Sequence, residues 1–289
     1  MSEEAAIRRA AGWVAGRTGL VWVGGPDAVT FLDGLLSQNI AALPAGRGAR
    51  SLLLAPNGKL RAVLWVIRQN DRVALLGDAG RTDAVAADLA RFRIRVDIEL
   101  ALEAKPIYDI WGPGAGRVAE QANADGAELA VAYPMQRSPL PRFVVVGRRP
   151  VADEMTPAAA EAIRIAEGEA VSGIDLDDAT IPQEALDVST AVDFAKGCYL
   201  GQELVARIDS RGRVNRRIKG LVFAGSATPY PGESLTYQGK VVGAATSTAW
   251  SDLLKAPVGL GMVRREVKDG FRVATESGEA TVAPLPLRK

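Results

Sequence analysis

The spacing of apolar residues changes several times along the first hundred residues, and each change predicts a different element. From Pro26 to Ile40 apolar residues recur at helical spacing, and Pro26 suits the first helical position. Shorter apolar runs are typical of strands, and Pro56-Asn57-Gly58 predicts a tight turn between two of them. Thr82 is a suitable cap for a helix that ends near Phe92. The predicted strands lie at residues 20–23, 51–55, 60–67, 73–76 and 94–98.

The middle of the chain continues the mixed pattern. Phe143 to Gly147 reads as a buried strand. Thr156 and Pro157 open a helical pattern that we expect to end at Glu167, with Gly168 as its stop. Strands, hairpins and helices in this order predict an α+β fold.

The pattern becomes purely β from about Leu221 onward. Short apolar runs are separated by turn pairs such as Gln238-Gly239 and Ser277-Gly278, as in a small antiparallel barrel or sandwich. We therefore predict an α+β region over residues 1–218, with room for two subdomains, and a C-terminal β-domain over 219–289.

Composition narrows the classes of function. The chain has 289 residues and a net charge of +1, so contact with nucleic acid or a membrane requires a local patch. The sequence has no uncharged apolar run long enough for a membrane span, so we expect none. Its start shows no signal-peptide pattern, and its single cysteine can form no internal disulfide. We therefore expect a cytoplasmic protein. The absence of histidine excludes a Ser-His-Asp triad and histidine-ligated zinc. One cysteine offers at most one ligand to an iron–sulfur cluster shared with a partner, and we predict no metal site.

The only cysteine lies in the segment Lys196-Gly-Cys-Tyr-Leu-Gly-Gln-Glu203. A neighbouring ammonium favours the reactive thiolate, so Lys196 beside Cys198 indicates a candidate reactive pair. Gly197 and Gly201 permit tight backbone geometry and close approach of a ligand. The alternative is that Cys198 is a small buried hydrophobic residue.

This segment resembles the Lys-Gly-Cys-Tyr-x-Gly-Gln-Glu signature of the YgfZ-type folate-binding proteins, relatives of the glycine cleavage T-protein. The resemblance extends over nearly the whole chain and implies the folate-binding fold of the T-protein with its C-terminal barrel. It also implies tetrahydrofolate or a one-carbon derivative as cofactor, and links to iron–sulfur protein maturation and tRNA modification. Cys198 and Lys196 become the candidate catalytic residues, and Tyr199 and Gln202 candidate cofactor contacts.

Folate needs a carboxylate for its pterin N–H edge and cations for its anionic tail. Glu184 matches a glutamate of the family pattern and is the first candidate for the carboxylate. Arg164 and Asp175 lie in the preceding family segment, with turn and salt-bridge duty as the alternative. Arg207 and Arg217 are candidates for the tail.

One departure from the family pattern concerns Glu167. The chain reads Arg164-Ile-Ala-Glu-Gly168 where T-proteins usually read Arg-Leu-Glu-Ala-Gly. On a helix this shift turns the carboxylate by about 100°. The resemblance therefore leaves open whether Glu167 replaces the usual glutamate.

The segment from Arg207 to Lys219 is strongly basic, with Asp209 as its only acidic residue. It suits a folate tail, a phosphate, a tRNA backbone or an acidic partner, and the alternative is a solvated loop. Because no aromatic residues are interleaved, an anionic small ligand is favoured over nucleic acid.

The resulting hypothesis is a folate-dependent accessory protein that acts with iron–sulfur client or scaffold proteins. The alternative is a tetrahydrofolate-dependent aminomethyltransferase, so the sequence leaves enzymatic activity undecided. A tRNA-binding modification factor is a third possibility, resting on the basic segment alone.

Overall fold

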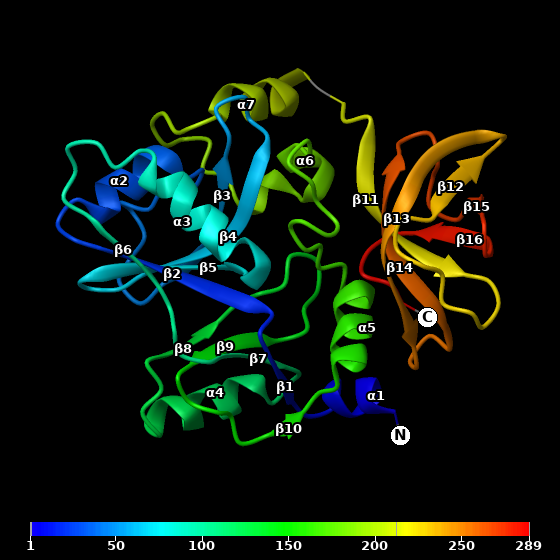
Figure 1. The fold of residues 1–289 in the computed structure, drawn as a ribbon, viewed down its shortest axis with the longest axis horizontal. Helices are drawn as coiled ribbons and strands as arrows, with labels where there is room; N and C mark the ends of the chain where they lie inside the picture. Colours follow the sequence, from blue (N-terminus) through cyan, green and yellow to red (C-terminus); the bar gives the residue numbers. More distant parts are fainter. Residues whose placement is uncertain (1, 212, 289) are drawn as a thin grey trace. The chain divides into compact units, whose positions relative to one another are not determined.

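The computed structural model describes residues 2–211 and 213–288, and the chain packs as two compact units of discontinuous sequence (Figure 1). We call residues 16–105 and 176–213 the motif unit, because it contains the cysteine segment. We call residues 1–15, 106–175 and 214–289 the barrel unit. The predicted boundary between residues 218 and 219 stays a prediction.

The motif unit is built on an antiparallel sheet of five strands, in the order β3-β4-β5-β2-β6. Phe31 and Leu32 of α2 share one apolar core with Val85 and Leu89 of α3 and with one face of the sheet, so both helices cover the same face (Figure 1). The strands are β2 (Thr18–Gly24), β3 (Gly48–Leu54), β4 (Leu60–Arg68), β5 (Arg72–Asp78) and β6 (Glu99–Leu102). The helices are α2 (Ala28–Leu35), η1 (Ala79–Arg81), α3 (Thr82–Ala90), α6 (Pro182–Ala185), η2 (Val188–Thr190) and α7 (Gln202–Arg211).

Four predictions in this unit are wrong. Thr82 is the first residue of α3 and Arg81 is its cap, and α2 ends at Leu35 rather than near Ile40. The other two have a common cause. The helix begins at Ala28 rather than Pro26, and residues 94–98 are irregular, with the strand beginning at Glu99. Asp27 explains both changes: its main-chain N–H donates to the Asp97 oxygen (3.2 Å), and its carboxylate accepts from the Asp97 N–H (2.8 Å). The polar groups of Asp97 are therefore satisfied by a helix start instead of a neighbouring strand.

The barrel unit contains a second sheet of five strands, in the order β10-β1-β7-β9-β8. Its longest helix, α5, begins and ends as predicted: Thr156 accepts a hydrogen bond from the Ala159 N–H, and Gly168 is left-handed with φ of 78°. The strands are β1 (Gly12–Ala15), β7 (Ile107–Trp111), β8 (Leu129–Ala132), β9 (Arg142–Val146) and β10 (Asp153–Glu154). The helices are α1 (Glu3–Ile7), α4 (Ala115–Ala124) and α5 (Pro157–Glu167).

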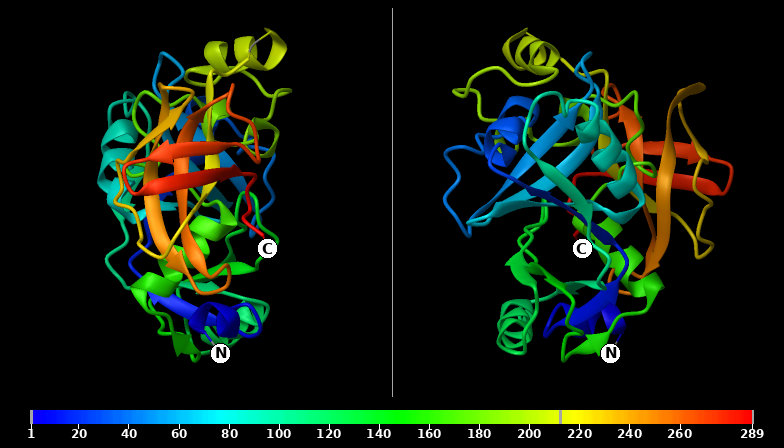
Figure 2. Two further views of the ribbon diagram at one scale, coloured as in Figure 1. Left: turned by 90° about the vertical axis from the view of Figure 1, so that its right-hand side faces the viewer. Right: turned by 60° about the vertical axis from the view of Figure 1, so that its left-hand side comes forward.

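The end of the chain forms a closed antiparallel barrel of six strands, in the order β11-β14-β13-β12-β15-β16 (Figure 2). At the β12–β13 hairpin Gln238 and Gly239 have φ of 49° and 74°, as a tight hairpin turn requires. The strands are β11 (Arg216–Phe223), β12 (Ser234–Tyr237), β13 (Lys240–Ser251), β14 (Ala256–Arg264), β15 (Arg272–Thr275) and β16 (Gly278–Ala283). The structure confirms the α+β fold with a small C-terminal barrel.

None of the helices in the described part of the chain has the length and hydropathy that a membrane span requires.

Candidate functional site

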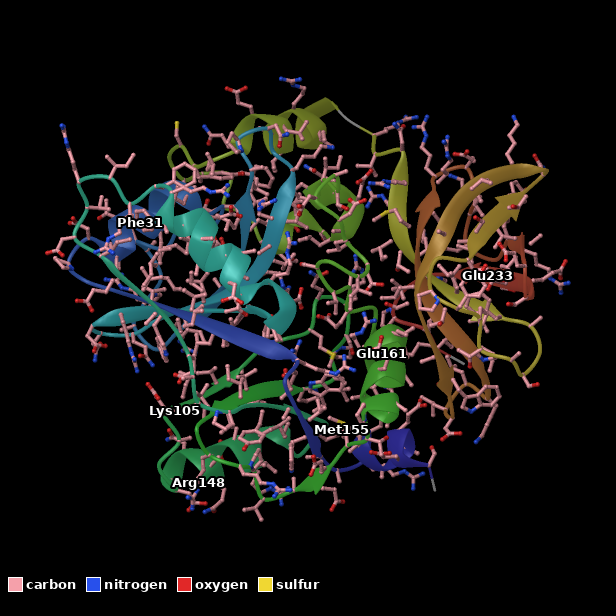
Figure 3. All side chains as sticks on the ribbon, viewed as in Figure 1. Phe31, Lys105, Arg148, Met155, Glu161 and Glu233 are labelled. Carbon is pink, nitrogen blue, oxygen red and sulfur yellow. The ribbon has the colours of Figure 1, made fainter. Side chains whose placement is uncertain are left out.

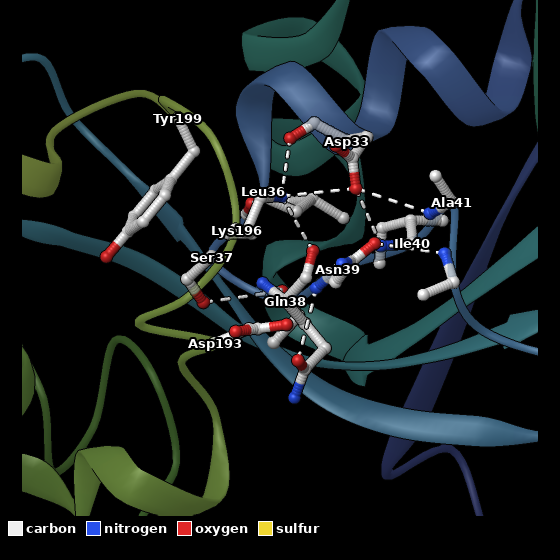
Figure 4. A network of polar contacts seen from close by, with 12 residues as sticks. Asp33, Leu36, Ser37, Gln38, Asn39, Ile40, Ala41, Asp193, Lys196 and Tyr199 are labelled. Carbon is white, nitrogen blue, oxygen red and sulfur yellow. Dashed lines mark hydrogen bonds and ion pairs between the residues drawn. The ribbon is translucent and has the colours of Figure 1, made fainter.

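Lys196, which begins the cysteine segment, has only 1% of its side chain exposed. Its ammonium donates to the main-chain oxygens of Asp33 (2.6 Å), Leu36 (2.9 Å) and Gln38 (2.9 Å) (Figure 4). It also lies 3.2 Å from the Asp33 carboxylate. Because α2 ends at Leu35, these oxygens belong to the end of the helix and the turn after it, where a cation is favoured. We call this arrangement the Lys196 cage.

Residues around the cage hold it in place. The Asp33 carboxylate accepts from the N–H of Ile40 (2.7 Å), which fixes the turn after α2 (Figure 4). The Tyr199 ring centre lies 5.7 Å from the Lys196 ammonium, and burial raises the pKa of Tyr199 above its usual value. Ser37 donates to the Ala191 oxygen (2.6 Å), so the start of the loop is bound to the same turn. The ammonium thus fastens the loop to α2, and its predicted effect on the thiol stays a prediction.

Cys198 is exposed, so the alternative of a buried small residue is wrong for this position. Phe194, four residues earlier, has 51% of its surface exposed. A Cβ added at Gly197 would meet no atom within 4 Å outside the neighbouring residues, so space is open at the residue before Cys198. The loop therefore presents a thiol and an aromatic ring on an anchored backbone.

Gly201 supplies a second anchor for the loop. Its φ is 77°, and an added Cβ would lie 2.5 Å from the Ala55 oxygen in the turn between β3 and β4. Gln202 accepts a hydrogen bond from the Tyr199 N–H through Oε1 (3.3 Å). Gly201 thus serves close backbone packing, whereas Gly197 leaves room for an approaching molecule.

Glu184, the candidate pterin carboxylate, lies in α6 and is 8% exposed. Its Oε2 accepts from the Ile181 N–H (3.1 Å) at the start of this short helix. The preceding Gln183 donates to the Val205 oxygen in α7 (3.0 Å), and this hydrogen bond joins the two helices. Arg207, also in α7, is exposed. The Oε1 atom of Gln183 is buried and has no hydrogen-bond partner among the described residues.

Gln183 is an acceptor that the sequence reasoning missed. The only signal was its position beside Glu184, because an unpaired buried oxygen is visible only in three dimensions.

Arg164 and Asp175 bind each other in the barrel unit, with Nη1 and Oδ2 2.7 Å apart. Arg164 also donates to Ser247 (2.6 Å), and Asp175 accepts from Thr246 and Ser247 at 2.6 Å each. Burial opposes the charge of Arg164, but Asp175 and Glu161 outweigh it, so the pKa of Arg164 is raised. This network fastens α5 to β13, which matches the salt-bridge alternative; the predicted folate contacts stay predictions.

Glu167 is fully buried and forms ion pairs with Arg8 and Arg288, and Ser138 donates to it. Burial favours the neutral acid, but the hydrogen bonds from Arg288 and Ser138 and the charge of Arg8 outweigh it, so the pKa of Glu167 is lowered. Its carboxylate is therefore committed to joining α5 to residues near both ends of the chain. This position serves the internal packing of the barrel unit.

The structure divides the predicted site residues between the units. The motif unit holds Glu184, Lys196, Cys198, Tyr199, Gln202 and Arg207, and the barrel unit holds Arg164, Asp175 and Arg217. The basic segment is divided as well, with its first part in α7 and its second in β11; the Arg211 side chain lies outside the described residues.

The barrel unit also contains a cavity of about 370 Å³, lined in part by Glu3, Glu161, Trp250 and Asp252. None of the predicted site residues lines it, and its carboxylates do not suit the anionic tail of folate. In the part of the chain that the structure describes, no three Cys, Asp or Glu side chains converge as metal ligands.

Sequence comparison finds relatives that carry two different protein names. The chain is 29% identical to an "iron-sulfur cluster assembly factor IBA57 homolog, mitochondrial" of Neurospora crassa, over 92% of this chain and 64% of the relative. A homologue of the same name from Mycosarcoma maydis is 28% identical over 74% and 57%. The "tRNA-modifying protein YgfZ" of Photorhabdus laumondii is 25% identical over 93% and 89%. The chain thus spans less than two thirds of the two fungal relatives, whose names state a mitochondrial location; a cytoplasmic location stays a prediction.

Two further comparisons concern the fold. The family described as glycine cleavage T-protein C-terminal barrel domain matches residues 216–288. The crystal structure of glycine cleavage system aminomethyltransferase T from Bartonella henselae superposes with a TM-score of 0.81 at 23% identity, over 98% of this chain and 88% of that one. At this identity the superposition shows a common fold alone. Together the comparisons show that the chain resembles the IBA57 and YgfZ proteins over most of its length and has the fold and C-terminal barrel of the glycine cleavage T-protein.

Proposed function

We propose that this chain binds tetrahydrofolate or a one-carbon derivative and assists the assembly or repair of iron–sulfur clusters on other proteins. The observation that carries the proposal is the exposed thiol of Cys198 on a loop anchored by the Lys196 cage. The names of the relatives support the same role.

Cys198 is the group that meets the cluster or a partner thiol. A thiolate binds iron, and a cluster usually takes four such ligands. Since the chain has one cysteine and no histidine, the partner has to supply the remaining ligands. The open space at Gly197 admits that partner beside the sulfur.

The acceptors of α6 fit the pterin of folate. Glu184 offers a carboxylate, and the unpaired Gln183 Oε1 offers a second acceptor for N–H donors. Arg207, on the adjoining α7, provides a cation for the anionic tail. Folate, when bound, carries one-carbon units; the protein groups bind and orient it.

Calorimetry with tetrahydrofolate and its one-carbon forms tests this site. Glu184→Gln replaces a charged acceptor with an amide that still accepts from Ile181, so the fold persists while binding weakens by about 1–3 kcal/mol. Glu99→Gln, at an exposed position in β6, is the matched control and leaves affinity unchanged. Absence of saturable binding of every reduced folate would refute the folate part of the proposal.

Complementation of a deletion strain, scored by the activity of an iron–sulfur enzyme, tests the role of Cys198. Because the side chain is exposed, Cys198→Ala leaves the fold and folate affinity unchanged, and it fails to restore the enzyme. Full rescue by Cys198→Ala would show that the thiol is dispensable.

The aminomethyltransferase alternative rests on the shared fold alone. Robust aminomethyl transfer to tetrahydrofolate by the purified wild-type protein would establish it and displace the accessory role.

A further inference from the structure

One end of the barrel collects basic residues from separate parts of the chain. The strands are antiparallel, with Arg216 opposite Arg264 and Tyr237 opposite Lys240. The starts of β11, β13 and β15 therefore lie at the same end as the last residues of β12, β14 and β16. Figure 3 shows nitrogen-tipped side chains around the upper end of β11 and its neighbours.

We call this group the barrel-end cations. Its members are Arg216, Arg217, Lys219, Lys240, Arg264, Arg265, Lys268 and Arg272. Glu266 and Asp269 lie in the same loop, and Glu279 lies beside Arg272 on the neighbouring strand, so eight positive charges face three negative ones. The net charge of the whole chain is only +1, so this local excess is a patch of the kind that attracts polyanions.

Internal ion pairs neutralise only part of this charge. Lys219 pairs with Asp269 (2.8 Å), and Arg272 lies 3.5 Å from Glu279. Arg217, Arg264 and Arg265 are exposed, and no carboxylate among the described residues pairs with them.

An exposed aromatic residue lies within this patch. Phe271 is 39% exposed and stacks on Tyr237, with ring centres 5.6 Å apart and planes at 29°. Its N–H donates to the Lys268 oxygen (3.1 Å), and Arg272 follows it directly. The sequence shows no aromatic residue within the segment 207–219; the barrel brings one to the same end.

We propose that the barrel-end cations bind the phosphate backbone of RNA, with Phe271 offering a stacking surface to an unpaired base. Arginine predominates in the patch, and its planar fork binds phosphate oxygens in pairs. Stacking of bases on aromatic rings beside cations is the usual mode of binding to single-stranded RNA. An acidic protein would satisfy the charges but would make no specific use of Phe271. The barrel-end cations include neither Cys198 nor Glu184, which belong to the motif unit, so the inference does not depend on the proposed function.

Fluorescence anisotropy with a labelled tRNA transcript and the full chain tests the proposal. Arg264→Glu with Arg265→Glu reverses two exposed cations and weakens binding at least about tenfold at 50 mM salt. Arg117→Glu with Arg148→Glu makes the same charge change at exposed positions elsewhere in the barrel unit and changes affinity less than about twofold.

Two milder variants test the contacts themselves. Arg264→Ala with Arg265→Ala lowers the magnitude of the slope of log K against log salt by about 1.4 to 1.8, since each lost phosphate contact removes about 0.7 to 0.9. Phe271→Ala weakens binding to single-stranded RNA more than binding to a duplex. Circular dichroism confirms that each variant is folded.

The proposal is overturned if wild-type protein shows no saturable tRNA binding, or if the control pair loses as much affinity as the barrel-end pair. It is equally overturned if polyglutamate peptide or phosphatidylserine vesicles bind this end and tRNA does not. We expect Cys198→Ala to bind tRNA like the wild type, because the thiol is not part of the barrel-end cations. Failure of the RNA-binding proposal can therefore be distinguished from failure of the proposed role of Cys198 with iron–sulfur clusters.

Discussion

Replacing Lys196 with methionine tests whether the cysteine loop is held by the buried ammonium. Methionine keeps the apolar stem and removes the charge, so the oxygens of Asp33, Leu36 and Gln38 lose their shared donor. The Asp33 carboxylate loses its ion-pair partner as well. The change is thus confined to the head group of the side chain.

The expected loss follows from burial. Each hydrogen bond to a charged donor contributes about 1.5–3 kcal/mol, and the contributions do not add fully because the oxygens share one ammonium. The Asp33 side chain is 28% exposed, so breaking this ion pair costs less than the roughly 3–5 kcal/mol of a fully buried pair. We therefore expect Lys196→Met to lower the free energy of unfolding by about 4 kcal/mol. With an m-value of about 2 kcal/mol/M, the urea midpoint falls by about 2 M.

Urea titration with peptide-level hydrogen exchange is the assay, because it follows the motif unit separately. Lys59→Met is the control: that ammonium donates to a single oxygen, of Ala179 (2.7 Å), at an exposed contact, and its loss costs less than about 1 kcal/mol. If Lys196→Met costs no more than Lys59→Met, the anchoring role is refuted. Alkylation of Cys198 in the folded variant tests the separate prediction that Lys196 activates the thiol, which then reacts more slowly.

Three further predictions concern stability. Gly201→Ala places a Cβ against Ala55 at a positive φ and lowers stability by about 1–3 kcal/mol, whereas Gly197→Ala changes it by less than about 0.5 kcal/mol; equal thermal melts would contradict the assigned difference. The pKa of Glu167 is lowered on folding, so its contribution is present above about pH 4.5 and is lost as pH falls through the folded pKa. The stability difference between wild type and Glu167→Gln in urea titrations therefore shrinks on acidification, and a constant difference from pH 7 to pH 3 would contradict this. Asp27→Ala removes the acceptor of the Asp97 N–H and costs about 0.5–1.5 kcal/mol, with faster hydrogen exchange expected over residues 94–98 and unchanged exchange as the contrary result.

Features governed by neighbouring residues were predictable from the sequence. The cap at Thr156 and the stop at Gly168 depend on residues within one helical turn, and the Gln238-Gly239 turn depends on its own backbone angles. The alternation of the last third likewise predicted the antiparallel barrel. The strand predicted at 94–98 failed because Asp27, distant in sequence, captures the backbone of Asp97.

In the candidate site, too, some features follow from the sequence alone and others depend on residues that are distant in the sequence. The sequence by itself determined that a single thiol lies in a Lys-Gly-Cys-Tyr-x-Gly-Gln-Glu segment and that no histidine is available to assist it. Only the tertiary structure decided that the Lys196 ammonium binds oxygens 158 to 163 residues earlier in the chain. It also paired Arg164 with Asp175 and gathered the barrel-end cations from separate strands. The physical reason is that hydrogen bonds and ion pairs depend on distance in space, whereas a sequence pattern records only distance along the chain.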